Sequence, residues 1–197
     1  VCSSDPFIVN RNDLGVGTQL ASRGAYDPEE IGLLRTLLGS FGTDGLVVLD
    51  IGANIGIHSV TLADAVGPRG KIHAFEAQRI VFQMLAGNIA LNSIENVFCH
   101  HRAVGEAPGR LEIPQFDYAK PLSFGSVEFG PEQREQIGQA RVFDPTRVEH
   151  VEIVTVDGMN LPLVHLMKVD VEGMELEVLR GARQTIARSD RKSTRLN

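Results

Sequence analysis

The fold is indicated most clearly by the stretch Val47-Val48-Leu49-Asp50-Ile51-Gly52-Ala53-Asn54-Ile55-Gly56-Ile57-His58, where an apolar run ends at an Asp and enters a glycine turn. A strand, a turn and a helix in this order form a nucleotide-binding cradle, because glycines let the backbone approach a ligand and a helix start offers free N–H groups. A dinucleotide site needs Gly-x-Gly-x-x-Gly, whose second glycine makes room for a pyrophosphate, but Asn54 stands at that position. The pattern therefore disfavours a pyrophosphate ligand. The alternative to a ligand-binding cradle is a turn that only closes a βα unit, with Asp50 as a helix cap.

A second strand is expected over residues 71–76, ending in an acid roughly 20 residues after the glycine turn. Parallel α/β nucleotide folds place there the carboxylate that holds the two ribose hydroxyls. Glu76 is the candidate for this role, and the alternative is a solvated Glu at a helix entry. Between the two strands, residues 59–68 have the pattern of a helix that is stopped by Gly67 and Pro68. The three segments predict a βαβ crossover.

A third informative segment, residues 166–182, has the pattern of a strand that ends in acids and breaks at Gly173 into an amphipathic helix. Lys168, Asp170 and Glu172 alternate along the strand end, so their side chains are expected on the same side. The two acids are candidates for contact with a ligand. The alternative is that they cap the helix after Gly173, where the helix dipole favours anions.

Several motifs of the chain are similar to those of a known enzyme family. The turn from Asp50 to Gly56, with the pattern Asp-x-Gly-x-Asn-x-Gly, resembles motif I of the S-adenosylmethionine-dependent methyltransferases. Further motifs are Phe75-Glu76-Ala77-Gln78, Asn88-Ile89-Ala90-Leu91-Asn92, Phe124-Gly125-Ser126 and the Lys-x-Asp-x-Glu-Gly pattern that begins at Lys168, the most specific part. With these motifs the chain closely resembles the FkbM family of methyltransferases, from about residue 5 to residue 188.

The resemblance implies a class I Rossmann-like fold, an α/β fold whose mostly parallel sheet carries helices on both faces. It also implies S-adenosylmethionine as methyl donor and methylation of a hydroxyl on a sugar or secondary metabolite. Asp50 would then face the cationic sulfonium and ammonium of the cofactor, Glu76 its ribose, and the third strand, residues 97–105, its adenine. The residues expected to bind the cofactor are Asp50, Gly52, Asn54, Gly56, Glu76 and Ala103.

Catalytic candidates follow from the chemistry of methyl transfer. It is an in-line displacement, so the enzyme chiefly holds the acceptor oxygen about 3 Å from the methyl group, aligned and dry. A base assists because a hydroxyl is a weak nucleophile. The candidates are Asp170, which we favour, Glu172, and His58, since imidazole titrates near neutral pH. Lys168 is expected to orient these acids or the acceptor, or only to pair with one of them, and for Glu172 the helix-cap alternative stays open.

Size and composition fit one α/β domain, with 197 residues of which 43% are hydrophobic and 22% charged. The net charge of −6 and the pI near 5.5 disfavour nucleic acid as a partner, since that binding needs clustered Lys and Arg. No apolar run approaches the roughly 20 residues of a membrane helix, so we expect a soluble, cytoplasmic protein without a membrane partner. The expected partner is a small-molecule hydroxyl acceptor, and the oligomeric state stays open.

Polar residues inside the predicted elements mostly indicate structural roles. The two cysteines do not form a disulfide framework, and Cys99 is expected as a small core hydrophobe. His100 and His101 face opposite sides of a strand and form a poor chelate, so no metal site is expected. Asn88 and Asn92 lie one helical turn apart, and we slightly favour a solvated face over ligand contact for both.

Three regions are expected along the chain. Residues 1–45 are irregular to about Gly24 and then helical from Asp27-Pro28 to Gly39, with Asp as N-cap and Pro at the first position. Residues 46–189 form the methyltransferase domain, with an insertion at about 109–150 that carries substrate contacts or is a flexible surface excursion. Residues 190–197 look like a translated sequencing adapter, so the natural sequence is expected to end near Ser189 here and to lack the further strands of the family. A basic polar tail is the alternative.

Two other classes of protein remain as alternatives. A nicotinamide-dependent oxidoreductase shares the βαβ cradle and the ribose acid, but Asn54 disfavours it. A non-catalytic ligand-binding module would keep the fold without the chemistry, and the presence of Asp50, Glu76 and Asp170 disfavours it.

Overall fold

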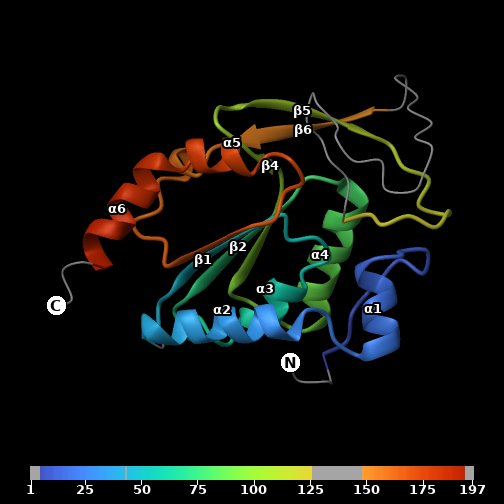
Figure 1. The fold of residues 1–197 in the computed structure, drawn as a ribbon, viewed down its shortest axis with the longest axis horizontal. Coiled ribbons are helices and arrows are strands. Elements are labelled where there is room, and N and C mark those ends of the chain that lie inside the picture. The colour runs from blue at the N-terminus through green and yellow to red at the C-terminus, as the bar shows by residue number, and fades with distance from the viewer. Residues whose placement is uncertain (1–4, 43, 126–147, 194–197) are drawn as a thin grey trace.

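In the computed structural model the described residues are 5–42, 44–125 and 148–193, with side chains described to residue 189. They form a four-stranded parallel sheet flanked by helices and a smaller three-stranded sheet at one end (Figure 1). The helices are α1 (Val16–Arg23), α2 (Pro28–Ser40), α3 (Ile57–Leu62), α4 (Arg79–Leu91), α5 (Glu175–Arg180) and α6 (Arg183–Ser193), with a 3₁₀ turn η1 (Asp157–Met159). The strands are β1 (Val47–Ile51), β2 (Lys71–Glu76), β3 (Val97–His101), β4 (Ala103–Val104), β5 (Gly109–Pro114), β6 (Val148–Val154) and β7 (Leu166–Val169). None of the described helices is long and apolar enough to cross a membrane.

The large sheet has the strand order β3-β2-β1-β7, and all three of its pairings are parallel. The chain passes from β1 through α3 to β2 and from β2 through α4 to β3, which confirms the predicted βαβ crossover and the Rossmann-like α/β class. Because the strands are parallel, their carboxyl ends meet at one edge of the sheet. In the register of β1 with its neighbours, Asp50 lies opposite Ala74 of β2 and Lys168 of β7.

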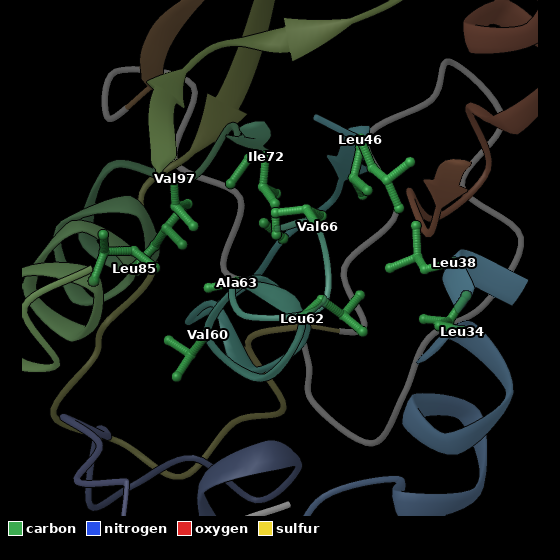
Figure 2. Close-up of a cluster of buried hydrophobic side chains, with 14 residues drawn as sticks. Leu34, Leu38, Leu46, Val60, Leu62, Ala63, Val66, Ile72, Leu85 and Val97 are labelled. Carbon is green, nitrogen blue, oxygen red and sulfur yellow. The ribbon is translucent and has the colours of Figure 1, made fainter. Parts of the chain in front are cut away.

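Apolar side chains fill both faces of the large sheet, as expected for parallel strands buried on both sides. On one face, Leu38 of α2, Ile72 of β2 and Leu85 of α4 belong to one buried cluster (Figure 2). On the other face, Leu49 of β1 packs in a second cluster with Val178 of α5. The helices therefore cover both faces and leave the carboxyl edge of the strands accessible.

The expected third strand, residues 97–105, is divided between two sheets. β3 continues the large sheet, but the chain turns at Arg102, whose N–H donates to the His100 carbonyl at 2.9 Å. β4 then pairs with β6, and β5 pairs with β6 in the antiparallel sense. The prediction of one continuous strand was wrong because the pairing partner of β4 lies about 50 residues away along the chain, as β6 shows.

The start of the chain is more ordered than its composition indicates. Residues up to Gly24 were expected to be irregular, but α1 forms there. The buried carboxylate of Asp13 accepts from the N–H groups of Gly15 and Gly17 at 2.9 and 2.8 Å, and Gly24 ends the helix in the left-handed conformation. The next helix, α2, begins as predicted, with the Asp27 side chain accepting from the Glu30 N–H at 3.2 Å.

Asn88 is buried, and the expectation of a solvated face was wrong for it. Its side-chain amide donates to the Ile8 carbonyl at 3.2 Å and to the Ile55 carbonyl at 2.8 Å, and its oxygen accepts from the Ile8 N–H. Asn92, one turn later, donates to the Pro6 carbonyl at 3.0 Å. Both residues therefore fasten the N-terminal segment to α4, and Asn88 also supports the turn after β1.

The side chains of β3 confirm the predicted alternation. Cys99 packs against the buried cluster that contains Leu38, Ile72 and Leu85, as expected for a small core hydrophobe. His100 lies on the opposite face, stacked on Phe75 with ring centroids 4.6 Å apart. His101 returns to the helix face and stacks on Phe82 of α4 at 5.1 Å.

Of the expected insertion at about 109–150, the structure describes residues 109–125 and 148–150, which contain β5 and the start of β6. Residues 126–147, which lie within the insertion, fall outside the described residues, so the substrate contacts expected there stay a prediction. At the other end, the backbone of α6 continues through residues 190–193, the first part of the expected tail.

Candidate functional site

A cavity opens where β1, β2 and β7 end, and the small sheet closes one side of it with residues of β4 and β5. Parallel α/β sheets bind their ligands at this edge. Six of the site residues expected from the sequence line the cavity: Gly52, Asn54, Glu76, Ala103, Asp170 and Glu172. The parallel strand order brings them together because each one follows or ends a strand.

Four other expected site residues lie behind this wall: Asp50, Gly56, His58 and Lys168. Gly56 has a φ of +89° at the start of α3, and a Cβ there would lie 2.6 Å from Leu85 Cδ1 of α4. Its freedom from a side chain therefore lets the turn pack on α4. Asp50, His58 and Lys168 are charged or polar and buried, so their contacts decide what they can do.

The turn after β1 is fixed by its backbone. Gly52 has a φ of +81°, and a Cβ there would collide with the carbonyl oxygen of Asp170. The N–H groups of Gly52 and Ala53 both donate to the Phe75 carbonyl, at 3.0 and 2.8 Å. Asn54 follows with a φ of +51°, a conformation that Asn adopts more readily than most residues. The turn is thus tied to β2 on one side and touches the end of β7 on the other.

Glu76 is buried at the end of β2, and the backbone around it fixes its carboxylate. One oxygen, Oε2, accepts from the Asn54 N–H at 3.1 Å, and Oε1 accepts from the Gln78 N–H at 2.7 Å. Burial raises the pKa of Glu76 to about 7, although these backbone hydrogen bonds oppose the shift. A carboxylate has about four acceptor positions, so Glu76 can still accept hydrogen bonds from a diol in the cavity.

Residues 118–125 close over the glycine turn through contacts that the sequence reasoning missed. The Gln78 side chain donates to the Phe124 carbonyl at 2.7 Å, and the Tyr118 hydroxyl donates to Gln78 Oε1 at 3.3 Å. At Gly125 an added Cβ would press on the side-chain amide of Asn54. Phe124 and Gly125 of one motif noted in the sequence therefore contact Gln78 and Asn54 of two others. The motifs were visible in the sequence, but their contact was not, because the partners of Gln78 are 40 and 46 residues away along the chain.

Lys168 lies between two carboxylates. Its Nζ donates to Asp170 Oδ2 at 3.1 Å and lies 3.8 Å from Asp50 Oδ1. The other oxygen of Asp50 accepts from the Ser59 hydroxyl at 2.7 Å. Burial lowers the pKa of Lys168, but the carboxylates of Asp50 and Asp170 outweigh burial and the net pKa is raised. Lys168 is therefore an ammonium ion that joins the end of β1 to the end of β7.

His58 lies on the α2 side of this charged group. Its Nε2 is 3.2 Å from Glu30 Oε2, and its ring meets the edge of Tyr26 with centroids 6.5 Å apart. Burial raises the pKa of Tyr26, and the carboxylate of Asp170 adds to the shift. His58 thus stands near the Asp170 end of the site but away from the cavity wall, which favours Asp170 over His58 as the group that meets a substrate.

The helix-cap alternative for Asp170 is not what the structure shows. The helix after Gly173 is α5, whose N-cap is Met174 and has no side-chain capping bond. Asp170 instead accepts from Lys168. Its side chain is 65% exposed and lines the cavity.

A parallel sheet with a glycine turn after its first strand and a buried acid at the end of its second defines a protein with a Rossmann-like α/β fold. Residues 50–193 of the chain match the methyltransferase FkbM domain. Because the match covers more than half of its length, the chain belongs to the FkbM family of methyltransferases, and the resemblance seen in the sequence is confirmed.

Two curated relatives are similar to this chain. It is 27% identical over 147 residues to Methyltransferase 1 of Beauveria bassiana (strain ARSEF 2860), an alignment that covers 70% of this chain and 59% of that protein. It is 29% identical over 158 residues to Methyltransferase sdnD of Sordaria araneosa, covering 68% of this chain and 59% of that protein. The chain therefore spans 59% of the length of each of these relatives. Among solved structures, it is 26% identical to a protein-L-isoaspartate O-methyltransferase, with a TM-score of 0.34 over 38% of this chain and 23% of that one.

Proposed function

We propose that this protein binds S-adenosylmethionine in the cavity and transfers its methyl group to a hydroxyl of a small molecule, on a sugar or a secondary metabolite. The observation that carries the proposal is Glu76, a buried acid on the cavity wall that backbone N–H groups hold beside the glycine turn of an FkbM domain. An ionised carboxylate there is the acceptor that two ribose hydroxyls need. The ligand has no phosphate, in agreement with Asn54 at the position where a dinucleotide site has a glycine.

The lining of the cavity supports one orientation of the cofactor. Ala103 of β4 and Leu111 of β5 give an apolar wall at the small sheet, which suits adenine. Glu76 lies at the end of β2 and suits the ribose. Asp170 and Glu172 follow β7 and give the acidic end that suits the cationic sulfur.

Asp170 is the group that we propose to accept the proton of the substrate hydroxyl. Lys168 binds its Oδ2, which leaves Oδ1 available on an exposed side chain at the cavity. As the new oxygen–carbon bond forms and the carbon–sulfur bond breaks, the bonding electron pair goes to sulfur and the hydroxyl proton goes to Asp170. The positive charge on sulfur and the negative charge on Asp170 disappear together, so the step leaves no new charge in the cavity.

The charges at this end favour an acceptor that is neutral around its reactive hydroxyl. Asp170 and Glu172 are acidic, and the charge of Lys168 is already shared by Asp50 and Asp170. A phosphate or carboxylate beside the hydroxyl would meet like charges, which disfavours binding. Neutral sugars and neutral hydroxylated metabolites have no such group.

Transfer of a radiolabelled methyl group from S-adenosylmethionine tests the proposal. The acceptors are a panel of neutral sugars and hydroxylated metabolites, each paired with a phosphorylated or carboxylated analogue. We expect label on neutral hydroxyl acceptors, loss of transfer in Asp170→Asn, and normal transfer in Glu95→Gln, which removes an exposed carboxylate elsewhere. Label only on anionic acceptors or on amines would contradict the proposed substrate class.

A further inference from the structure

The buried acid Asp50 does not line the cavity that the cofactor is proposed to occupy. It is 2% exposed and lies opposite Lys168 in the β1–β7 register. One carboxylate oxygen, Oδ2, accepts from the Ser59 hydroxyl of α3 at 2.7 Å. The charge of Asp50 is therefore directed toward Lys168 and α3, behind the wall.

The second oxygen of Asp50 is a buried acceptor without a hydrogen bond. Asp50 Oδ1 has no hydrogen-bond partner among the described residues, and Lys168 Nζ is the cation beside it at 3.8 Å. Buried carboxylate oxygens are normally satisfied, so this one needs an explanation. Lys168 Nζ donates to Asp170 at 3.1 Å, and a shift of less than 1 Å toward Asp50 would bring it within hydrogen-bond distance of Oδ1.

We propose that Asp50 is a positioning residue that takes up the ammonium of Lys168 when a cationic sulfonium nucleoside binds beside Asp170. This inference rests on the proposed function of the cavity. In the free protein, Lys168 stays with Asp170. When the sulfonium arrives, Lys168 moves to Asp50 Oδ1, and the carboxylate of Asp170 is left to face the cofactor and the substrate hydroxyl.

Charge balance gives the physical reason. The ammonium of Lys168 and the sulfonium would both lie against Asp170 and repel each other. Asp50 removes the conflict because its carboxyl group is buried, and therefore weakly screened, on the far side of the lysine. Among the described residues, the other charged or titratable groups around Lys168 are Glu30 of α2 and Tyr26 before it, with His58 of α3 in contact with both. None of them offers a buried carboxylate oxygen in register with Lys168.

Two ligands separate this role from direct cofactor contact. S-adenosylmethionine and S-adenosylhomocysteine share the adenosine and the amino-acid group, and differ in the methyl group and the charge on sulfur. If Asp50 acts through Lys168 on the sulfonium, its loss weakens only S-adenosylmethionine. The sequence led us to expect Asp50 to face the sulfonium and the ammonium of the cofactor. If Asp50 faces the ammonium, its loss weakens both ligands equally.

The test is calorimetric titration of both ligands into the wild-type protein and three variants. Asp50→Asn should weaken S-adenosylmethionine by about tenfold and S-adenosylhomocysteine by less than about twofold, since one charge interaction is lost for one ligand only. Ser59→Ala keeps the carboxylate of Asp50 and should leave the ratio of the two affinities unchanged. The double variant Asp50→Asn with Lys168→Met removes both charges. Its ratio of S-adenosylmethionine affinity to S-adenosylhomocysteine affinity should be equal to or higher than that of the wild-type protein.

The outcomes are distinct. An equal loss for both ligands in Asp50→Asn, or no loss for either, would overturn the inference. If Asp50→Asn alone does not fold, the double variant is the test. An affinity for S-adenosylmethionine, relative to S-adenosylhomocysteine, that is well below the wild-type value in the double variant contradicts the role of Lys168. Failure of the wild-type protein to bind either ligand would instead contradict the proposed function.

Discussion

The two ends of the cavity hold their acids in different ways. At the ribose end, backbone N–H groups of Asn54 and Gln78 fix both oxygens of the buried Glu76. At the β7 end, Asp170 is exposed and accepts from the side chain of Lys168, which it shares with Asp50. An acid held by the backbone has one geometry, whereas an acid held by a shared lysine changes its surroundings when the charges nearby change. We therefore expect the first end to determine the affinity for the adenosyl group. The second end should determine the chemistry and the preference for a charged over a neutral sulfur.

The largest effect is expected from the loss of the exposed acid. Asp170→Asn keeps the size of the side chain but cannot accept the hydroxyl proton, so the methyl-transfer rate should fall by roughly 100-fold or more. The affinity for S-adenosylhomocysteine should change little. Rate measurements at saturating cofactor, with calorimetry on the same variant, check this. Equal losses in rate and affinity would make Asp170 a cofactor ligand and would remove the difference between the two ends.

The complementary change at the other end should act on affinity. Glu76→Ala removes a charged acceptor of two ribose hydroxyls, so S-adenosylhomocysteine should bind more weakly by about 1.5 to 3 kcal/mol. Calorimetric titration of the variant measures this, with Glu95→Gln as the control for loss of an acid elsewhere. Unchanged binding would exclude Glu76 from the site.

A substitution at Gly52 can destabilise the turn after β1 directly. Gly52→Ala forces a side chain into a left-handed conformation and against the carbonyl of Asp170, so the free energy of unfolding should fall by roughly 2 kcal/mol or more. The matched control is Gly32→Ala in α2, where an added Cβ meets nothing within 4 Å and should stabilise the protein by about 0.5 to 1 kcal/mol. Urea unfolding measures both. A Gly52→Ala variant as stable as wild type would show that the turn is not held as tightly as described.

A pH dependence is also expected at the ribose end, because the pKa of its buried acid, Glu76, lies near neutral pH. The pKa of Glu76 is raised from its ordinary 4.5 to about 7, so below pH 7 a proton must leave before the ribose binds. The affinity for S-adenosylhomocysteine should then fall by up to about tenfold per pH unit below 7. For the free protein the sign is opposite: a raised carboxyl pKa contributes stability at low pH that is lost as the pH rises from 4.5 to about 7.

Calorimetry and urea unfolding between pH 5 and 8 check both signs. Glu76→Gln does not titrate, so it should remove this part of both dependences. An affinity that is flat across this range in the wild-type protein would contradict the buried, proton-exchanging acid at the ribose end.

Features encoded by neighbouring residues were predictable from the sequence. The N-cap Asp27 and the following Pro28 marked the start of α2, and the apolar run before Gly52 marked β1 and its turn. These signals are local, because a cap or a left-handed turn is decided by a few adjacent residues. The parallel direction of the strands followed from the alternation of strand and helix patterns along the chain.

Features that depend on distant partners were missed. Asn88 is buried because its amide bonds to Ile8, which lies 80 residues earlier, and no pattern within α4 indicates this. Tyr118 and Gln78 meet for the same kind of reason. In the site, Lys168 was expected to orient Asp170, Glu172 or the acceptor, or only to pair with one of these acids. The register of β7 on β1 additionally places Asp50 beside it, behind the cavity wall.

The central claim is that a cavity at the carboxyl ends of the strands binds an S-adenosyl cofactor. Calorimetric titration of the wild-type protein with S-adenosylhomocysteine and, separately, with NAD tests this claim most directly. We expect S-adenosylhomocysteine to bind with a Kd of roughly micromolar strength, about 8 kcal/mol, and NAD to give no binding heat under the same conditions. Micromolar binding of NAD together with no binding of S-adenosylhomocysteine would contradict the claim and would favour a nicotinamide-dependent oxidoreductase.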